Sequence, residues 1–318
     1  IMHQVEIITP APPRSLHGNR VTAQRWQGFL TRLGYQSSIT QSWSGKDIDL
    51  MIALHAYRSH PSINKFKSAH PDKPLLLVIT GTDIYRDMSR HPEVLISINL
   101  ADAIVVLQPE AIELIPAKYR DKVYIIYQSV ETIKSREKPK RSFLVSVIGH
   151  LRPEKDPFCI VRAIPYLDED SRVKIHHLGM AMSPDMKKLA LQYSKKIDRY
   201  SWLGECSHRK TMQELARSHV LVISSRMEGG AHVVSEAIAA GTPVIASAIA
   251  GNHGLLGKNY PGYFPVENER ALAKLITKAE TNPKFYQSLA RKVKALQKQV
   301  QPQRELASIR KLVRSLTK

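Results

Sequence analysis

Two glutamates eight residues apart, Glu228 and Glu236, mark the segment whose residue types best fit a chemical role. Gly229 and Gly230 come between them, after an apolar stretch typical of a buried strand and before a pattern typical of a helix. Glycine lets backbone N–H groups approach a ligand closely, and a helix N-terminus carries partial positive charge. The sequence therefore predicts an anion site, suited to a diphosphate, at Gly229, Gly230 and Ala231.

The two carboxylates suggest contacts with a sugar nucleotide. Glu236 has apolar neighbours on its predicted helix, so its carboxylate would be partly desolvated and would need hydrogen-bond donors. The two hydroxyls of a ribose would supply them. Glu228, in the turn before the helix, could accept hydrogen bonds from sugar hydroxyls. The alternative is a surface pair of glutamates that flanks an ordinary helix start.

Basic residues follow the first predicted strand of the second half, in the stretch Gly149-His150-Leu151-Arg152-Pro153-Glu154-Lys155-Asp156. Arg152 and Lys155 beside a departing diphosphate would neutralise its developing charge without a metal or a general acid. The alternative is an unremarkable basic pair in a loop.

A long loop after the first predicted strand offers a second approach to phosphate. Asn19 is expected to cap the following helix, and Gly18 allows close backbone approach. A simple cap beside a proline-stiffened loop is the alternative.

These loops need a scaffold, and the chain alternates short β-branched runs with amphipathic stretches, which predicts βα units and parallel sheets. The expected strands are Val5 to Thr9, Ser38 to Gln41, Leu50 to Leu54, Leu75 to Thr80, Ile104 to Leu107, Val123 to Tyr127, Phe143 to Ile148, Lys174 to Leu178, Val220 to Ser224 and Pro243 to Ala246. The expected helices are Arg20 to Leu33, Ser62 to Ala69, Glu93 to Leu100, Glu110 to Tyr119, Phe158 to Tyr166, Pro184 to Ile197, Met212 to Ser218 and His232 to Ala240.

The predicted fold class is α/β, with two Rossmann-like doubly wound domains, a cleft between them and a helical C-terminal tail. Residues 1–130 would form the N-terminal domain and residues 142–300 the C-terminal domain, which carries the predicted anion site. Residues 131–141, rich in cations and without apolar periodicity, would be the linker. Residues 301–318 would form a helix able to pack back across it.

Composition narrows the classes of protein further. The 318 residues are 43% hydrophobic and 24% charged, which fits a globular chain, and no apolar run approaches the roughly 20 residues of a membrane span. Before Pro10 only Val5 to Ile8 is apolar, with no basic leader, so we expect no secretory signal and a cytoplasmic location. Cys159 and Cys206 are expected to be reduced and incidental.

The net charge of +19, from 47 Lys+Arg against 28 Asp+Glu, would attract any anion, including nucleic acid, acidic membranes and phosphorylated small molecules. Aromatic residues make up only 7% and no recognition motif is apparent, which argues against specific nucleic-acid binding. A basic surface without specific meaning is the alternative.

No metal site is predicted. Asp47-Ile-Asp49 has the Asp-x-Asp pattern of a metal site, but it precedes its strand instead of following one and indicates a polar strand entry. His176 and His177 alternate across a predicted strand, so their rings would point to opposite faces.

Glu-x7-Glu after a strand, in the second of two Rossmann-like halves, resembles the nucleotide-sugar site of GT-B retaining glycosyltransferases, particularly glycosyltransferase family 4. The resemblance implies that Glu228 contacts the donor sugar and Glu236 the ribose. Lys155 fits the family's basic pair directly. His150 stands at the position of the family's arginine, so Arg152 is expected to take that role.

Longer stretches resemble the SenB-type selenosugar synthases of selenoneine biosynthesis. They span residues 9 to 265 and are Thr9-Pro-Ala-Pro-Pro-Arg14 with Gly18-Asn-Arg-Val-Thr-Ala23, Ala53-Leu-His-Ala56 with Arg58-Ser59, Thr80-Gly-Thr-Asp83, Gly149-His-Leu-Arg152 with Lys155-Asp-Pro157, Glu228-Gly-Gly-Ala231, and Gly254-Leu-Leu-Gly257 with Tyr260-Pro-Gly-Tyr-Phe-Pro265. This resemblance implies transfer of glucose or N-acetylglucosamine from a UDP-sugar to selenophosphate. The products would be a 1-selenosugar, UDP and phosphate, and no cofactor would be needed.

Such an acceptor is an anion that needs no strong base, and the loops after first-half strands carry Arg14, Arg20, His55, Arg58 and Arg86. Arg20, Arg58 and Arg86 would suit bidentate contacts with a phosphate-like group. Asp83 would position a sugar hydroxyl or a water, or would cap the segment after its strand. His55 would be a supporting donor or a packed histidine at the strand end. The nearest rival is a glycosyltransferase acting on a hydroxyl or lipid acceptor.

Overall fold

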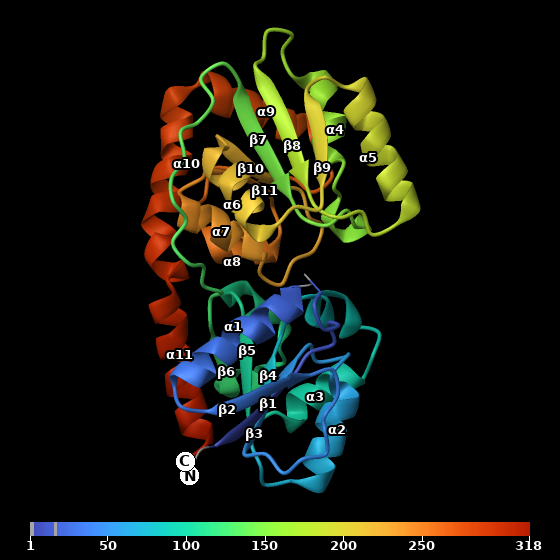
Figure 1. Cartoon of the computed structure of the whole chain (residues 1–318), viewed down its shortest axis with the longest axis vertical. Coiled ribbons are helices and arrows are strands. Elements are labelled where there is room, and N and C mark those ends of the chain that lie inside the picture. The colour runs from blue at the N-terminus through green and yellow to red at the C-terminus, as the bar shows by residue number, and fades with distance from the viewer. Residues whose placement is uncertain (1–2, 16–17) are drawn as a thin grey trace. The chain divides into compact units, whose positions relative to one another are not determined.

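The computed structural model describes residues 3–15 and 18–318. The chain forms two compact units, an N-terminal unit of Ile1–Gln128 with Pro302–Lys318 and a C-terminal unit of Ser129–Gln301. Each contains one parallel six-stranded sheet with helices (Figure 1). The predicted α/β class with two Rossmann-like domains and a helical C-terminal region is therefore confirmed.

The sheet of the N-terminal unit has the strand order β2-β1-β3-β4-β5-β6. Its strands are β1 (Gln4–Ile8), β2 (Gln36–Thr40), β3 (Leu50–Leu54), β4 (Leu75–Val78), β5 (Ala103–Val106) and β6 (Val123–Ile125). The helices are α1 (Gly18–Arg32), α2 (His60–Ala69), α3 (Glu93–Leu100) and α11 (Pro302–Leu316), with a π-helical turn η1 (Asp83–Asp87) and 3-10 helices η2 (Pro109–Leu114) and η3 (Ala117–Lys122). The strands β3, β4 and β5 are buried throughout, as expected where helices cover both faces of a parallel sheet.

The last helix completes the core of the first unit. Ile309, Leu312 and Val313 of α11 pack in the same apolar cluster as Trp26 of α1, and the two helices lie side by side (Figure 1). The indole N–H of Trp26 donates to Glu305 Oε1 at 2.9 Å. The C-terminal residues therefore belong to the core of the N-terminal unit.

The sheet of the C-terminal unit has the order β12-β11-β10-β7-β8-β9. Its strands are β7 (Phe143–Ile148), β8 (Val173–Leu178), β9 (Tyr200–Gly204), β10 (Val220–Ile223), β11 (Val244–Ser247) and β12 (Tyr263–Phe264). The helices are α4 (Cys159–Ala163), α5 (Pro184–Lys196), α6 (His208–Arg217), α7 (His232–Ala240), α8 (Ala250–Leu256), α9 (Glu269–Thr281) and α10 (Pro283–Leu296), with 3-10 helices η4 (Pro153–Lys155), η5 (Ile164–Tyr166) and η6 (Gln297–Val300).

Glycine is required where the carboxyl ends of β7 and β8 meet. A Cβ at Gly179, whose φ is +149°, would lie 1.9 Å from the carbonyl oxygen of Gly149. Such an approach is closed to any other residue, so this pair brings the two strand ends together beside the loop that carries Arg152 and Lys155.

Several elements differ from the sequence prediction, among them the unpredicted strand β12. The expected helix Glu110 to Tyr119 is wrong, because Pro116 holds Ile115 extended at ψ 130° and splits the stretch into η2 and η3. The strand β9 and the short helix α8 were not predicted. The side chains of β9 are mostly half-buried, which gives no continuous apolar run.

Within the described residues, no helix combines the length and apolar character needed to cross a bilayer.

Candidate functional site

The candidate site of the C-terminal unit begins where the chain order in its sheet reverses. From β7 the chain continues to β8 on one side, whereas β10 lies on the other. In open parallel sheets, ligands bind beyond the carboxyl ends of the strands at such a switch point. A shallow recess lies there, lined in part by Gly149, Lys155, His177 and Ser225.

Lys155 and Glu228 come together at this point from loops 73 residues apart. Lys155 Nζ donates to Glu228 Oε1 at 2.7 Å, and the Ser225 hydroxyl donates to the same oxygen at 2.7 Å. The ammonium group has three donors, of which this contact uses one. Lys155 therefore fixes Glu228 and keeps hydrogen-bonding capacity for an anion.

Two further contacts hold these loops to each other. Ser224 Oγ donates to the carbonyl of Asp156 at 2.8 Å, and the Arg226 amide donates to the carbonyl of Glu154 at 2.8 Å. Asp156 adopts a left-handed conformation, φ 41°, and its carboxylate pairs with Arg162 at 2.8 Å. The geometry between Lys155 and Glu228 is therefore set by the backbone of both loops.

The turn at Gly229 and Gly230 leads into α7 through Ala231 in the N-cap position. Ala231 has no side-chain oxygen and therefore cannot cap the first turn of this helix through its side chain. Because first-turn amides lack partners inside a helix, they can donate to a bound anion, and the helix dipole favours negative charge there.

Glu236 is 7% exposed on α7 and is held by two histidines. Its Oε1 receives a hydrogen bond from His208 Nε2 at 3.1 Å and lies 3.4 Å from His232 Nδ1. Burial acts to raise the pKa of Glu236, but the hydrogen bonds from His208 and His232 outweigh it and lower the pKa to about 2. The same hydrogen bond raises the pKa of His208. Glu236 is therefore a buried carboxylate that stays ionised.

Arg152 lies directly before η4, and its guanidinium group has a donor without a hydrogen-bond partner among the described residues. Among the described residues, its buried Nε has no hydrogen-bond partner. A buried donor without an acceptor is costly, and an anionic ligand would satisfy it.

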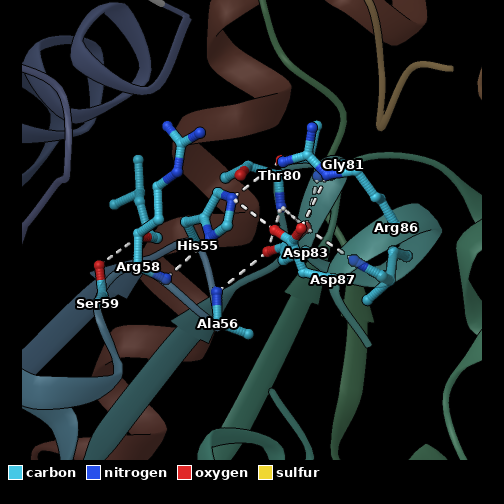
Figure 2. A network of polar contacts seen from close by, with 12 residues as sticks. His55, Ala56, Arg58, Ser59, Thr80, Gly81, Asp83, Arg86 and Asp87 are labelled. Atoms are coloured by element: carbon cyan, nitrogen blue, oxygen red, sulfur yellow. Dashed lines mark hydrogen bonds and ion pairs between the residues drawn. The ribbon is translucent and has the colours of Figure 1, made fainter. Parts of the chain in front are cut away.

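In the N-terminal unit, His55 and Asp83 join the loops that follow β3 and β4 (Figure 2). Asp83 is fully buried and its carboxylate accepts from the amides of Ala56, Thr80, Gly81 and Ile84 at 2.7–3.2 Å. These contacts match the capping alternative rather than contact with a sugar hydroxyl or a water.

His55 is 2% exposed and has φ 77°, a conformation that is rare for residues with a side chain. Its Nδ1 accepts from the Arg58 amide at 3.1 Å, and its Nε2 lies 2.9 Å from Thr82 Oγ1 and 3.7 Å from Asp87 Oδ2. Arg58 is exposed, and Arg86 donates from Nε to Asp87 Oδ1 at 2.9 Å. His55, Asp83, Arg58 and Arg86 are thus brought together, whereas Arg20 lies on α1 with a buried Nε that has no partner among the described residues.

Gly18 and Asn19 open α1 in the N-terminal unit, whereas the other predicted donor residues belong to the C-terminal unit. The expectation that Asn19 caps this helix is wrong, because α1 already includes Gly18 and Asn19.

The Asp-x-Asp pattern and the His-His pair, which were not predicted to bind a metal, contact other side chains and the backbone. Asp47 pairs with Lys73, and Asp49 accepts from the Gln4 amide at 2.7 Å. His176 contacts Glu214 of α6 at 2.9 Å, whereas His177 contacts Tyr200 at 2.8 Å.

Sequence reasoning assigned no role to Ser225, His208 or His232. His232 lies four residues before Glu236 on the same helix, a spacing that places both on one face and could have revealed it. His208 comes from α6, and no local signal links it to Glu236.

Two Rossmann-like sheets with a helical C-terminal region define the GT-B class of glycosyltransferase folds. The chain belongs to the family described as glycosyl transferases group 1, whose model matches residues 129–296. No curated protein matches the sequence.

Solved structures agree in fold. HepE of Anabaena in complex with UDP and glucose is 14% identical with a TM-score of 0.77, covering 98% of this chain and 100% of that one. Sucrose-phosphate synthase from Thermosynechococcus elongatus is 15% identical with a TM-score of 0.79 and 99% coverage of both chains. A glycosyltransferase from Rickettsia africae is 12% identical with a TM-score of 0.77, covering 100% and 99%.

Proposed function

We propose that this glycosyltransferase is a selenosugar synthase, which transfers glucose or N-acetylglucosamine from a UDP-sugar to selenophosphate. The C-terminal unit would bind the donor and the N-terminal unit the acceptor. The observation that carries the donor assignment is the Lys155–Glu228 contact, 2.7 Å long, beside the uncapped start of α7. The chain's similarity in fold to HepE, crystallised with UDP and glucose, supports the same assignment.

The donor residues have separate tasks in this proposal. The first-turn amides of α7, with Gly229 and Gly230, bind the diphosphate, and Glu236 accepts from the ribose hydroxyls. Glu228 accepts from hydroxyls of the sugar. Arg152 and Lys155 stabilise the charge that develops on UDP as it leaves, since cations aimed at a leaving group act most strongly in the transition state.

The acceptor assignment is supported by the match to the SenB-type segments and by the arginines of the N-terminal unit. Arg58 and Arg86 lie beside the network of His55 and Asp83, and two guanidiniums suit a phosphate-like dianion (Figure 2). Selenium would attack the anomeric carbon, and the bond from that carbon to the β-phosphate oxygen would break with its electron pair going to UDP. Attack of water on phosphorus would then release phosphate and leave the selenol.

The test is a product analysis with the purified protein. We expect UDP-glucose or UDP-N-acetylglucosamine with selenophosphate to give UDP, phosphate and a selenium-containing sugar in mass spectra. Release of UDP that requires an alcohol or lipid acceptor and ignores selenophosphate would refute the selenium acceptor and support the rival. Absence of UDP release with every acceptor would refute the enzyme assignment.

A further inference from the structure

The two loops that carry Arg58 and Arg86 are joined by reciprocal hydrogen bonds. His55, at the end of β3, reaches Thr82 in the loop after β4 at 2.9 Å. In the other direction, Asp83 accepts from the amide of Ala56 at 3.1 Å. The segments 55–58 and 80–87 are therefore linked by hydrogen bonds from both sides.

The contacts of His55 define its protonation state. Nδ1 faces the Arg58 N–H, which only donates, so Nδ1 must be an unprotonated acceptor. The single ring proton is then on Nε2, which faces Thr82 Oγ1. The ring is neutral and holds the backbone of Arg58 on one side and Thr82 on the other.

A second observation is that a carboxylate, Asp87, lies near the His55 ring and would favour its protonated form. Asp87 Oδ2 is buried and has no hydrogen-bond partner among the described residues, and it lies 3.7 Å from His55 Nε2. A second proton, on Nδ1, would make the ring a cation that this carboxylate attracts. It would also place an N–H against the Arg58 N–H at 3.1 Å, which would break that contact.

The charged groups around His55 oppose one another. Burial lowers the pKa of His55 below its ordinary 6.5, Asp83 and Asp87 act to raise it, and Arg58 and Arg86 act to lower it. The ring therefore stays neutral at pH 7 and takes up its proton only in more acidic solution.

The backbone of His55 indicates a functional constraint. Its φ of 77° is unfavourable for a residue other than glycine, and such strain gathers at binding sites. The side chains of Arg58 and Arg86 extend from the two loops on the same side of the network (Figure 2).

We propose that neutral His55 is a positioning residue that fixes Arg58 relative to Arg86, so that the two guanidiniums form a preformed site for a tetrahedral dianion. The inference rests on the proposed function only for the natural ligand, the phosphate-like group of the acceptor. Protonation of His55 releases the Arg58 backbone and weakens the site.

Sulfate is the probe, because it is a tetrahedral dianion that does not titrate between pH 5 and 8. Its binding to the full-length protein is measured by calorimetry in saturating UDP, which keeps the donor site occupied. We expect the wild type to bind sulfate and to lose affinity below pH 6.5, and Arg58→Met to bind at least about tenfold more weakly.

Two substitutions at His55 separate positioning from general stability. Asn places a carbonyl oxygen where Nδ1 accepts, tolerates a positive φ and does not titrate, whereas Ala supplies no acceptor. We expect His55→Asn to bind sulfate within about threefold of the wild type at pH 8 and to lose the acid weakening. His55→Ala should bind about tenfold more weakly at every pH, since it loses the acceptor of the Arg58 amide and with it the order of the loop.

UDP affinity and thermal unfolding of each variant are the controls. The inference is overturned if the wild type does not bind sulfate, if His55→Ala binds like the wild type, or if His55→Asn keeps the acid weakening. Sulfate binding as expected without sugar transfer to selenophosphate would remove the proposed acceptor and leave this inference intact. Transfer with unchanged sulfate affinity in His55→Ala would remove this inference alone.

Discussion

At the scale of single residues, the proposed donor site depends on a carboxylate, Glu236, that its neighbours keep ionised. Glu236 is buried and would lose its charge without donors, yet His208 and His232 supply them at the same oxygen, Oε1. Burial and pairing together thus make a strong acceptor from an otherwise ordinary glutamate.

Glu236→Gln tests this acceptor. The amide keeps the shape but removes the charge, so we expect UDP to bind about tenfold more weakly, as for a lost charged hydrogen bond of about 1.5 kcal/mol. Titration calorimetry with UDP measures the change. Glu169→Gln, at an exposed loop position of the same unit, is the control and should bind like the wild type. Equal affinity in both variants would contradict the role of Glu236.

His177 predicts how the stability of the protein depends on pH. Burial lowers its pKa to about 3 from 6.5, so the unfolded chain takes up a proton in this window while the folded protein does not. Unfolding therefore becomes easier as the pH falls, by about 3 kcal/mol between pH 6.5 and 4. Denaturant unfolding across that range should show a smaller decrease in His177→Gln, because glutamine does not titrate. An identical decrease in both proteins would refute the assignment.

At the scale of elements, α11 stabilises a unit far from it in sequence. Glu305 is 3% exposed and pairs with Arg25 Nε at 2.9 Å as well as with the indole of Trp26. Removal of the carboxylate would leave the buried indole N–H of Trp26 without its acceptor. It would also take the ion-pair partner from Arg25, which is partly buried and, among the described residues, keeps only its Nη2 contact with Gln128.

Glu305→Ala should therefore destabilise the N-terminal unit by about 3 kcal/mol. Gln303→Ala, at an exposed position on the same helix, should change little. Chemical denaturation measures both. If Glu305→Ala lowers the free energy of unfolding no more than the control does, α11 contributes through its apolar residues alone.

Two glycines in helices make a matched pair. A Cβ at Gly251 of α8 would lie 2.2 Å from the carbonyl oxygen of Glu228, whereas a Cβ at Gly28 of α1 would meet nothing within 4 Å. Gly251→Ala should displace the Glu228 loop and weaken UDP binding at least about tenfold. The reason is that the two nearest atoms, the carbonyl oxygen and carbon of Glu228, are backbone atoms that cannot turn away. Gly28→Ala should stabilise α1 by about 0.5–1 kcal/mol and leave UDP binding unchanged. Unaltered UDP affinity in Gly251→Ala would contradict the first expectation.

At the scale of the whole molecule, the net charge of +19 produces a field that attracts anions of every kind. Such a field raises the local concentration of phosphorylated substrates and also attracts nucleic acid. A specific ligand differs from nucleic acid in that it needs side chains held in place by hydrogen bonds and ion pairs. Such side chains lie in the loops after β3, β4, β7 and β10.

Nucleic-acid binding by this field should be weak and without sequence preference. We expect the affinity for DNA and RNA to fall by about 10³-fold or more between 50 and 200 mM salt, because it comes from the release of counterions. Fluorescence anisotropy with several sequences measures it. Tight, sequence-dependent binding at 200 mM salt would favour a nucleic-acid-binding protein instead.

The sequence by itself determined the fold class, and it predicts which loops carry the proposed donor site. The alternation of strand and helix patterns indicates parallel sheets, whose ligands lie at the carboxyl ends of the strands. Glu228, Glu236 and Lys155 follow from this rule together with residue type. Strand β9 was not predicted from the sequence, because its half-buried residues show no clear hydrophobic period.

Only the tertiary structure decided which side chains act on one another. The contacts of Lys155 with Glu228 and of His208 with Glu236 join elements 73 and 28 residues apart, and no local pattern encodes such pairs. Asp83 and His55 left two readings open in the sequence. The structure assigns Asp83 to four backbone amides and His55 to Arg58 and Thr82, because the loops that hold them meet only when β3 and β4 lie side by side.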